Sequence, residues 1–143
     1  MKVLSIVGKS KRGKTTLLRQ LISSLKKRGY TICVVKHSSQ QLSYRDFDHE
    51  GKDTYTFSEA GADEVWLTSP QLTYHVKPEE ISLDTIINST KADFIFTEGF
   101  KSANTKKIVI TNPGEHITVT GEILFTIEGE YDLEEIVEVL IYS

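Results

Sequence analysis

The feature that most constrains the fold of this chain is a basic loop at residues 8–13, which begins and ends with glycine. It lies between an apolar segment and a segment with the apolar spacing of an amphipathic helix. Residues 3–7 are rich in β-branched side chains, which is typical of a strand buried on both faces. After the polar loop, apolar residues recur at helical spacing, as Leu17, Leu18, Leu21, Ile22 and Leu25. Residues 30–36 form a second run that is typical of a buried strand. The beginning of the chain therefore predicts a β-α-β unit with a right-handed crossover.

The rest of the chain continues to alternate between strands and helices. Apolar patterning predicts further strands at residues 65–67, 72–76, 94–96, 107–111, 116–120 and 123–127. Helices are predicted at residues 53–60, around residues 83–87 and after Asp132, which forms a capping-box spacing with Glu135. A length of 143 residues without repeats or linkers predicts one domain over residues 1–143. The predicted fold class is α/β, a P-loop-type three-layer sandwich with a mostly parallel sheet.

Residues 8–15 match the phosphate-binding pattern G-x-x-x-x-G-K-[ST]. Gly8 and Gly13 allow the backbone to wrap closely, so that successive N–H groups point at a phosphate. Lys14 suits β- and γ-phosphate oxygens, the Thr15 hydroxyl suits Mg²⁺, and the following helix directs its positive end toward the same anion. We predict that a nucleoside triphosphate is held by Gly8, Lys9, Ser10, Lys11, Arg12, Gly13, Lys14, Thr15 and Thr16.

Lys9 has a second interpretation. It stands where one dimeric branch of P-loop proteins carries a lysine that reaches into the partner subunit. The alternative is a solvated cation that, with Lys11 and Arg12, attracts a triphosphate electrostatically.

A phosphate loop needs a second contact to the metal, usually an acidic residue at the end of a neighbouring strand. Glu98 follows the apolar run at residues 94–96, and we expect it at the sheet edge where phosphate loops lie. We assign Glu98 to the metal and its bound water, and to catalysis together with Lys14. Asp93 opens the same strand at its other end, where we expect it to cap or pair locally.

Residues 37–53 form a long polar connection without periodicity, which is typical of a functional loop. We expect a switch-like loop that closes on the γ-phosphate and Mg²⁺, with Asp48 or Asp53 near the metal and Lys52 near the phosphates. The alternative for each residue is a solvated loop position. A calcium loop is disfavoured because its ligand pattern and terminal Glu are missing, and the histidines lack zinc-like spacing.

The sequence motifs do not identify which base the bound nucleotide carries. Residues 90–93 match the guanine-reading tetrapeptide T-K-x-D of GTPases, but here the tetrapeptide precedes a strand instead of following one. We interpret the match as coincidence.

Charge and cysteine content narrow the class of partner. Lys and Arg number 17 against 20 Asp and Glu, a formal net charge of −3, which argues against a dedicated nucleic-acid-binding module. The single cysteine, Cys33, cannot form an internal disulfide, which is typical of a reducing compartment. No export signal or membrane span is recognisable. We expect a cytoplasmic protein that binds neither nucleic acid nor membrane.

Beyond the phosphate loop, several short blocks follow in order. They are Val35-Lys36-His37, Asp48-x-x-Gly51-Lys52-Asp53-Thr54, Glu59-Ala60-Gly61-Ala62 and D-F-I-F-T-E-G-F-K at residues 93–101. Together with the loop, these blocks resemble the MobB family of molybdopterin-guanine dinucleotide biosynthesis adapter proteins. The resemblance covers most of the first 110 residues, whereas the last 30 carry no distinctive motif.

The resemblance implies a small P-loop protein that binds GTP with Mg²⁺, hydrolyses it slowly at best and tends to form homodimers. It also implies assistance to the guanylyltransferase that attaches GMP to molybdopterin, with molybdopterin cofactor as a further contact. Carried over by position, the residues expected along the nucleotide edge are Gly8, Gly13, Lys14, Thr15, Lys36, His37, Asp48, Lys52, Asp53 and Glu98. Family members often carry more histidines after Lys-His, whereas residues 38–41 read Ser-Ser-Gln-Gln.

Two functions of other classes remain as alternatives. A small P-loop kinase would use the same loop, but an arginine-bearing lid after the central strands is not recognisable. A non-catalytic scaffold would bind an anion only for stability. Because no glutamine stands where it would orient water after a D-x-x-G turn, we expect at most slow GTP hydrolysis.

Overall fold

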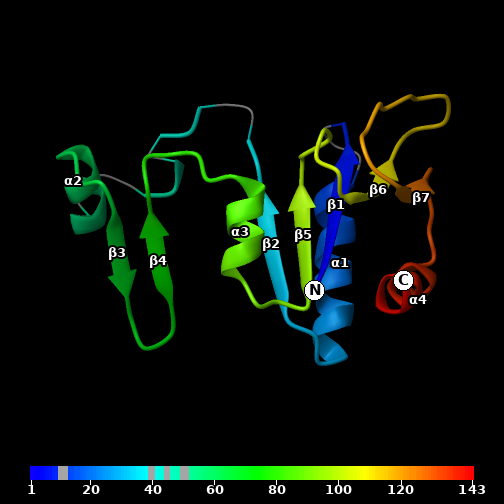
Figure 1. Cartoon of the computed structure of the whole chain (residues 1–143), viewed down its shortest axis with the longest axis horizontal. Coiled ribbons are helices and arrows are strands. Elements are labelled where there is room, and N and C mark those ends of the chain that lie inside the picture. Colours follow the sequence, from blue (N-terminus) through cyan, green and yellow to red (C-terminus); the bar gives the residue numbers. More distant parts are fainter. Residues whose placement is uncertain (10–12, 39–40, 44–45, 49–51) are drawn as a thin grey trace. The chain divides into compact units, whose positions relative to one another are not determined.

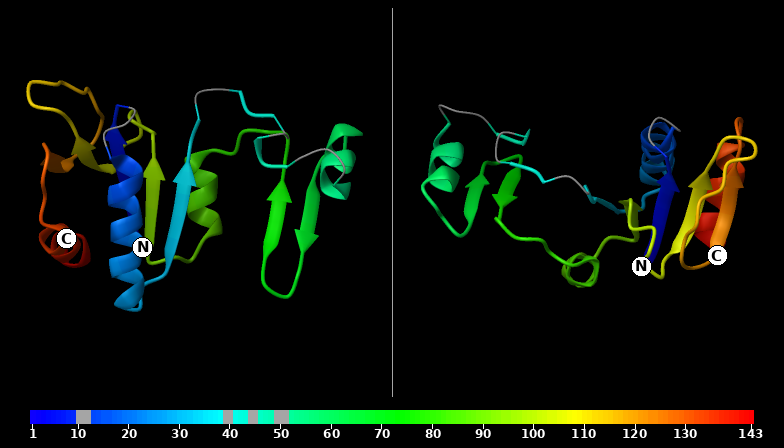
Figure 2. Two further views of the ribbon diagram at one scale, coloured as in Figure 1. Left: turned by 180° about the vertical axis from the view of Figure 1, so that it is seen from behind. Right: turned by 90° about the horizontal axis from the view of Figure 1, so that it is seen from above.

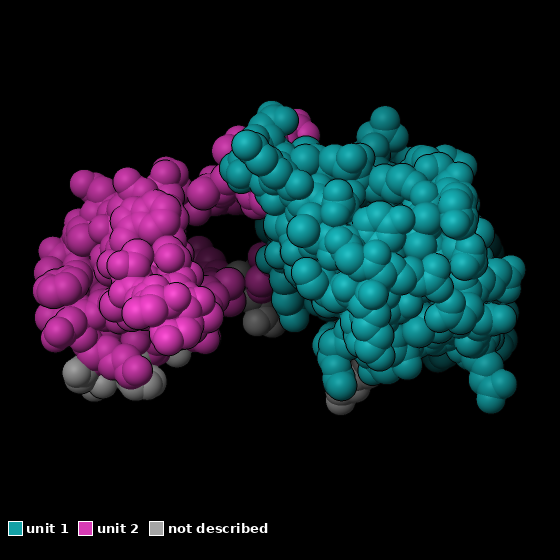
Figure 3. All heavy atoms as spheres, turned by 90° about the horizontal axis from the view of Figure 1, so that it is seen from below, with its two compact units in different colours: residues 1–37, 87–143 teal, residues 38–86 magenta. Residues whose placement is uncertain are grey.

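A computed structural model describes residues 1–9, 13–38, 41–43, 46–48 and 52–143 of the chain. Its contacts form two compact units, coloured teal and magenta in Figure 3. Unit 1 comprises Met1–His37 and Ile87–Ser143, and unit 2 comprises Ser38–Ile86. A single domain over residues 1–143 stays a prediction.

Unit 1 is built on a five-stranded sheet in the order β2-β5-β1-β6-β7 (Figure 1). The strands are β1 (Lys2–Gly8), β2 (Ile32–Lys36), β5 (Phe94–Glu98), β6 (Lys106–Ile110) and β7 (Ile123–Ile127). Every pairing in this sheet is parallel. The α/β class with a mostly parallel sheet is therefore confirmed, and β1, which leads into the phosphate loop, occupies the centre.

One face of this sheet carries the apolar core. Helices α1 (Lys14–Lys27) and α4 (Leu133–Tyr142) lie on this face (Figure 2). They pack against each other and share a buried cluster with alternate residues of the strands. Leu17, Leu21 and Leu25 of α1 are fully buried, as the helical spacing predicts. On the sheet side, the cluster takes every second residue, for example Leu4 and Ile6 of β1.

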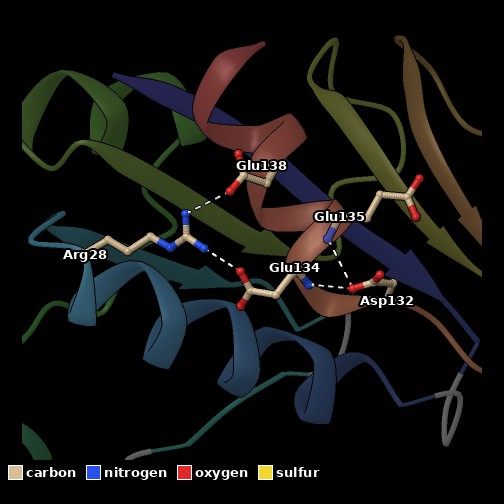
Figure 4. Close-up of polar contacts among 5 residues, drawn as sticks. All are labelled: Arg28, Asp132, Glu134, Glu135 and Glu138. Atoms are coloured by element: carbon tan, nitrogen blue, oxygen red, sulfur yellow. Dashed lines mark hydrogen bonds and ion pairs between the residues drawn. The ribbon is translucent and has the colours of Figure 1, made fainter.

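Polar contacts hold α4 at both ends, and Figure 4 shows those around its first turns. The Asp132 carboxylate accepts hydrogen bonds from the backbone N–H groups of Glu134 and Glu135, as expected for an N-cap. Arg28, just after α1, forms ion pairs with Glu134 and Glu138. At the other end of α4, the Lys2 ammonium donates to the carbonyls of Leu140 and Ile141 at 2.7 and 2.6 Å.

Unit 2 contains α2 (Asp53–Glu59) and an antiparallel hairpin of β3 (Val65–Thr68) and β4 (Thr73–Val76). Helix α3 (Leu83–Ser89) begins in this unit. The Trp66 ring stacks on the His75 ring at 3.5 Å between centroids, and His75 Nε2 lies 2.9 Å from Glu64 Oε1. Among the helices that the structure describes, none is both long and apolar enough to cross a membrane.

One sequence-based strand prediction was wrong, and another was right about the strand but wrong about its start and its burial. The run at residues 30–36 becomes a strand only from Ile32, and it is a partly exposed edge strand because only β5 pairs with it. Residues 116–120 form no strand, because they belong to the connection between β6 and β7, where the Thr120 N–H donates to Lys101 O.

Candidate functional site

The carboxyl ends of β1, β5, β2 and β6 meet at one edge of the sheet. The register pairs Gly8 with Ile110, Ile6 with Glu98 and Lys36 with Glu98. Parallel α/β sheets bind ligands at this edge, where connections leave toward both sides of a central strand. The phosphate loop and Glu98 are therefore brought together, as predicted.

The first glycine of the loop lies against the neighbouring strand. A Cβ built on Gly8 would stand 2.8 Å from the Ile110 carbonyl oxygen, closer than real Cβ atoms approach backbone. At the other end of the loop, Gly13 has φ 89°, and a Cβ there would meet nothing within 4 Å. The loop thus requires glycine at its start for space and at its end for conformation.

Helix α1 begins directly after this loop, and among the described residues no side chain caps its first N–H groups. Its N-cap residue is Gly13, which has no side chain to offer, and Lys14–Lys27 contains no acid in its first turn. The first N–H groups of a helix lack intrahelical acceptors, and the helix dipole adds positive potential there. Such an end is suited to an anion. Thr15 and Thr16, in this first turn, are exposed.

Glu98 is held between two ammonium groups. Its Oε1 lies 3.8 Å from Lys14 Nζ and its Oε2 lies 3.9 Å from Lys36 Nζ. The side chains of Lys14 and Glu98 are 20% and 16% exposed, so their charges are poorly screened compared with surface pairs. This arrangement places one carboxylate and two cations at the edge predicted for phosphate chemistry.

The turn after Glu98 brings His37 into the same region. Phe100 has φ 58°, which is uncommon for a residue with a side chain. The rings of His37 and Phe100 lie 5.1 Å apart between centroids, and the His37 N–H donates to Glu98 O at 3.2 Å. His37 therefore orders the start of this turn through its backbone and ring.

Lys9 has an acidic partner within the chain. Its Nζ lies 3.6 Å from Glu115 Oε2, and the Glu115 side chain is only 11% exposed. The Asn112 N–H donates to the other oxygen, Glu115 Oε1, at 3.2 Å. Glu115 is a residue that sequence reasoning missed; the Asn-Pro-Gly turn before it was the available signal. Ser10, Lys11 and Arg12 lie outside the described residues.

Thr111, at the end of β6, was also missed. It is 5% exposed, and its Oγ1 has no hydrogen-bond partner among the residues that the structure describes. A buried hydroxyl without a partner is uncommon in folded proteins.

The remaining predicted residues lie in unit 2. The Thr54 hydroxyl donates to Asp48, and burial with the charge of Asp48 raises the pKa of Tyr74. Asp53 is the first residue of α2, and Lys52 is its N-cap, whose carbonyl accepts from Thr56. The metal roles of Asp48 and Asp53 and the phosphate role of Lys52 stay predictions.

The residues in unit 1 fit a polyphosphate with a divalent cation. The close approach at Gly8 and the uncapped end of α1 suit phosphate oxygens, and Lys14 supplies a compensating charge. Thr15 and Glu98 offer oxygen ligands of the kind that Mg²⁺ takes. The described part of the chain contains no cluster of three or more His, Cys, Asp or Glu suited to a metal. Phosphates and water would supply the remaining ligands.

The chain is similar in sequence to a known protein family and to related proteins. Residues 3–125 match the model of the family described as MobB, molybdopterin guanine dinucleotide synthesis protein B. The chain is 35% identical over 113 residues to the molybdopterin-guanine dinucleotide biosynthesis adapter protein of Haemophilus influenzae, and 34% over 119 residues to that of Escherichia coli. These alignments cover 76% and 78% of this chain, but only 62% and 66% of the relatives.

Solved structures share the architecture over nearly the whole chain. A crystal structure titled molybdopterin-guanine biosynthesis protein B is 27% identical, with a TM-score of 0.75 over 98% of this chain and 97% of that one. A Bacillus subtilis MobB structure, at 20% identity, has a TM-score of 0.74 over 99% of this chain and 97% of that one, and shows the fold alone. The resemblance found in the sequence is thereby confirmed. Since the family match spans most of the chain, the protein belongs to the MobB family of molybdopterin guanine dinucleotide synthesis proteins.

Proposed function

We infer that this chain is a GTP-binding adapter protein that assists the guanylyltransferase step converting molybdopterin cofactor to its guanine dinucleotide form. The observation that carries this inference is the uncapped start of α1 after Gly13, with Lys14 Nζ 3.8 Å from Glu98 at the same sheet edge. The names of the related proteins support the biosynthetic role and the word adapter. This chain aligns to less than two thirds of the length of those relatives. Its guanylyltransferase partner and its contact with molybdopterin are therefore proposed here.

Each group at the carboxyl edge has a separate role in nucleotide binding. Backbone N–H groups of α1 bind phosphate oxygens, and the Lys14 ammonium neutralises charge on the β- and γ-phosphates. The Thr15 hydroxyl and Glu98 hold Mg²⁺, which supplies charge neutralisation when bound. Glu98 also orients the water that attacks the γ-phosphate. Lys36 and His37 border this region from the neighbouring strand.

Hydrolysis is expected to be slow. Both Lys14 and Lys36 are already paired with Glu98, so their charge is partly compensated before a transition state forms. Fast phosphoryl transfer needs cations directed at the charge that develops in the transition state. The protein then acts mainly through its nucleotide-bound form, as an accessory to another enzyme.

A cytoplasmic homodimer completes the proposal. The hairpin of unit 2 exposes Trp66, Leu67 and Leu72, at 59%, 53% and 76%. Exposed apolar side chains on a two-stranded hairpin favour association with another chain, since an isolated hairpin is only marginally stable.

Nucleotide titration by calorimetry tests the binding step, with GTP, ATP and GDP in the presence and absence of Mg²⁺. Replacing Lys14 by Ala removes a charged phosphate contact and should weaken GTP binding about tenfold to a hundredfold while leaving the fold intact. Lys91→Ala, an exposed lysine before β5 at the opposite edge, is the matched control and should bind normally. Equal GTP affinity in Lys14→Ala and wild type would contradict the proposal.

The adapter role has its own assay. Purified guanylyltransferase, molybdopterin cofactor and GTP are combined with the wild-type chain or with Lys14→Ala, and formation of the dinucleotide is followed. We expect stimulation by the wild type and little by the variant. No stimulation by a wild-type protein that binds GTP would reject the adapter role and leave the binding role standing.

A further inference from the structure

The sheet face opposite α1 carries a buried polar row directly behind the phosphate edge. The register places Thr97 of β5, Ser5 of β1 and Lys107 of β6 side by side. All three residues have 0% exposure. A fully buried lysine is rare in proteins, because removing an ammonium group from water is costly unless its donors are satisfied.

The three donors of Lys107 all have oxygen acceptors. Its Nζ donates to Ala103 O at 2.6 Å, to Thr105 O at 2.7 Å and to Thr105 Oγ1 at 2.7 Å. These acceptors belong to the segment between β5 and β6, so the lysine ties that segment down onto the sheet. Burial lowers the pKa of Lys107.

Hydroxyl groups extend the contact across the sheet. Thr105 Oγ1 and Ser5 Oγ lie 2.6 Å apart, and the Thr97 hydroxyl donates to Ser5 Oγ at 2.7 Å. The network therefore joins β6, the segment after β5, the central strand and finally the residue immediately before Glu98. Networks of this kind hold one arrangement when all members are satisfied.

A second path reaches Glu98 through the backbone. The Ala103 carbonyl accepts from Lys107, and the Ala103 N–H donates to Phe100 O at 3.1 Å. Phe100, with its positive φ of 58°, stands two residues after Glu98 and packs on His37. A backbone conformation of this kind costs free energy and persists only where surrounding contacts maintain it. Lys107 supports this turn indirectly, through the Ala103 peptide that bonds to Phe100 O.

We propose that Lys107 is a positioning residue for Glu98: its buried ammonium clamps residues 99–105 and thereby fixes the carboxylate that faces the metal and the γ-phosphate. This inference rests on the proposed function, since it concerns the same nucleotide edge. It predicts that the clamp affects ligands with a γ-phosphate more than ligands without one, because Gly8, Gly13 and the start of α1 bind the remaining phosphates independently of residues 99–105.

The test compares Lys107→Met with Lys106→Met. Lys106 is the exposed neighbour on β6, so the control makes the same change of charge and side chain one residue away. Calorimetry with GTP and with GDP, both with Mg²⁺, should show GTP affinity reduced about tenfold in Lys107→Met, with GDP affinity within about twofold of wild type. Lys106→Met should match wild type for both nucleotides.

A milder variant keeps the test decisive if Lys107→Met does not fold. Thr105→Val preserves shape but removes the hydroxyl that joins Lys107 to Ser5, and it should lower GTP affinity about threefold with GDP affinity unchanged. Hydrogen exchange in nucleotide-free protein should show faster exchange of the amides in residues 99–105 in Lys107→Met or Thr105→Val, and not in Lys106→Met.

The outcomes separate this inference from the proposed function. If wild type binds GTP and the Lys107 and Thr105 variants bind it equally well, the positioning role is rejected. An equal loss of GTP and GDP affinity also rejects it, because a purely structural defect affects both. A wild-type protein that binds neither nucleotide rejects the proposed function itself, whatever the exchange data show.

Discussion

The two ends of the strands in the five-stranded sheet differ in their polar contacts. The side where the strands begin is called the amino edge here, and the side where they end is called the carboxyl edge. At the amino edge, charged side chains satisfy the backbone: Lys2 donates to carbonyls at the end of α4, and Asp93 accepts from Thr31. At the carboxyl edge, α1 begins without a side-chain cap, and Thr111 Oγ1 has no partner among the described residues. The amino edge is thus tied down by its own side chains, whereas the start of α1 at the carboxyl edge lacks a side-chain cap, as the proposed nucleotide binding requires.

The two acids of β5 show the contrast within a single strand. Asp93 Oδ2 accepts from the Thr31 N–H at 2.8 Å and from the Thr31 hydroxyl at 3.0 Å, a partner 62 residues away and not the local one expected from the sequence. Glu98 instead faces two ammonium groups at 3.8 and 3.9 Å, distances of ion pairs without tight hydrogen bonds. Asp93 is thus committed to the fold, and Glu98 can exchange partners when a nucleotide arrives.

The largest effect is expected from adding one methyl group at the carboxyl edge. Gly8→Ala places a Cβ 2.8 Å from the Ile110 carbonyl, so the loop must move away from the sheet. We expect nucleotide binding to be lost and the free energy of unfolding to fall by about 1–3 kcal/mol, as for other overpacked sites. Calorimetry and urea denaturation measure the two quantities. Gly29→Ala, beyond the C-terminal end of α1, is the control: its φ of 90° strains an alanine and should lower the free energy of unfolding, but GTP affinity should stay unchanged. Normal GTP affinity in Gly8→Ala would contradict the geometry of the site.

The next effect concerns the amino edge and should leave nucleotide binding untouched. Lys2→Met replaces the lysine with an apolar side chain of similar length and removes both hydrogen bonds to the α4 carbonyls. We expect the free energy of unfolding to fall by about 1–2 kcal/mol, with GTP affinity unchanged. Urea denaturation gives the first value, and Lys91→Met serves as a control near the same edge. A marked loss of GTP affinity in Lys2→Met would break the distinction between the edges.

A smaller effect is expected from the acidic partner of Lys9, and it tests whether Lys9 binds phosphate. Glu115→Gln removes the charge that pairs with Lys9 and leaves the oxygen that accepts from Asn112. Lys9 is 57% exposed on its side chain, so the freed ammonium can turn toward phosphate. We expect GTP affinity to rise by up to about fivefold, the scale of a partly exposed ion pair, and the gain to shrink at high salt. The double variant with Lys9→Ala should abolish the gain; a gain that survives would show that Lys9 is not its source.

The sequence predicted the carboxyl edge well because strand direction decides it. In a parallel sheet, the carboxyl ends of all strands meet at one edge whatever the strand order, so the placement of Gly8, Lys36 and Glu98 at that edge follows from predicting their three strands. Strand order itself depends on non-local pairing, and for this reason β2 was expected to be buried although it is an edge strand.

Contacts between distant loops were beyond sequence reasoning. Glu115 meets Lys9 only because the connection after β6 approaches the end of β1 in the folded chain. Lys107 stands in a strand where a lysine usually predicts an exposed face, and its burial follows from the segment that covers it. In both cases the tertiary structure, and not the local pattern, decides the environment of the charge.

The smallest effect is a pH dependence at the amino edge. Two hydrogen bonds from Thr31 hold the pKa of Asp93 below its ordinary value of 3.8. A carboxyl with a lowered pKa in the folded state contributes stability above the pKa of the unfolded chain, and this stability is lost as the pH falls through the folded value. Asp93→Asn should therefore be less stable than wild type near pH 7, and the difference should narrow below about pH 4. Urea denaturation from pH 7 to pH 3 measures this, with the exposed Asp84→Asn as control. A difference that stays constant with pH would mean that Asp93 acts by shape and not by charge, and the amino edge would then owe less to electrostatics than the carboxyl edge does.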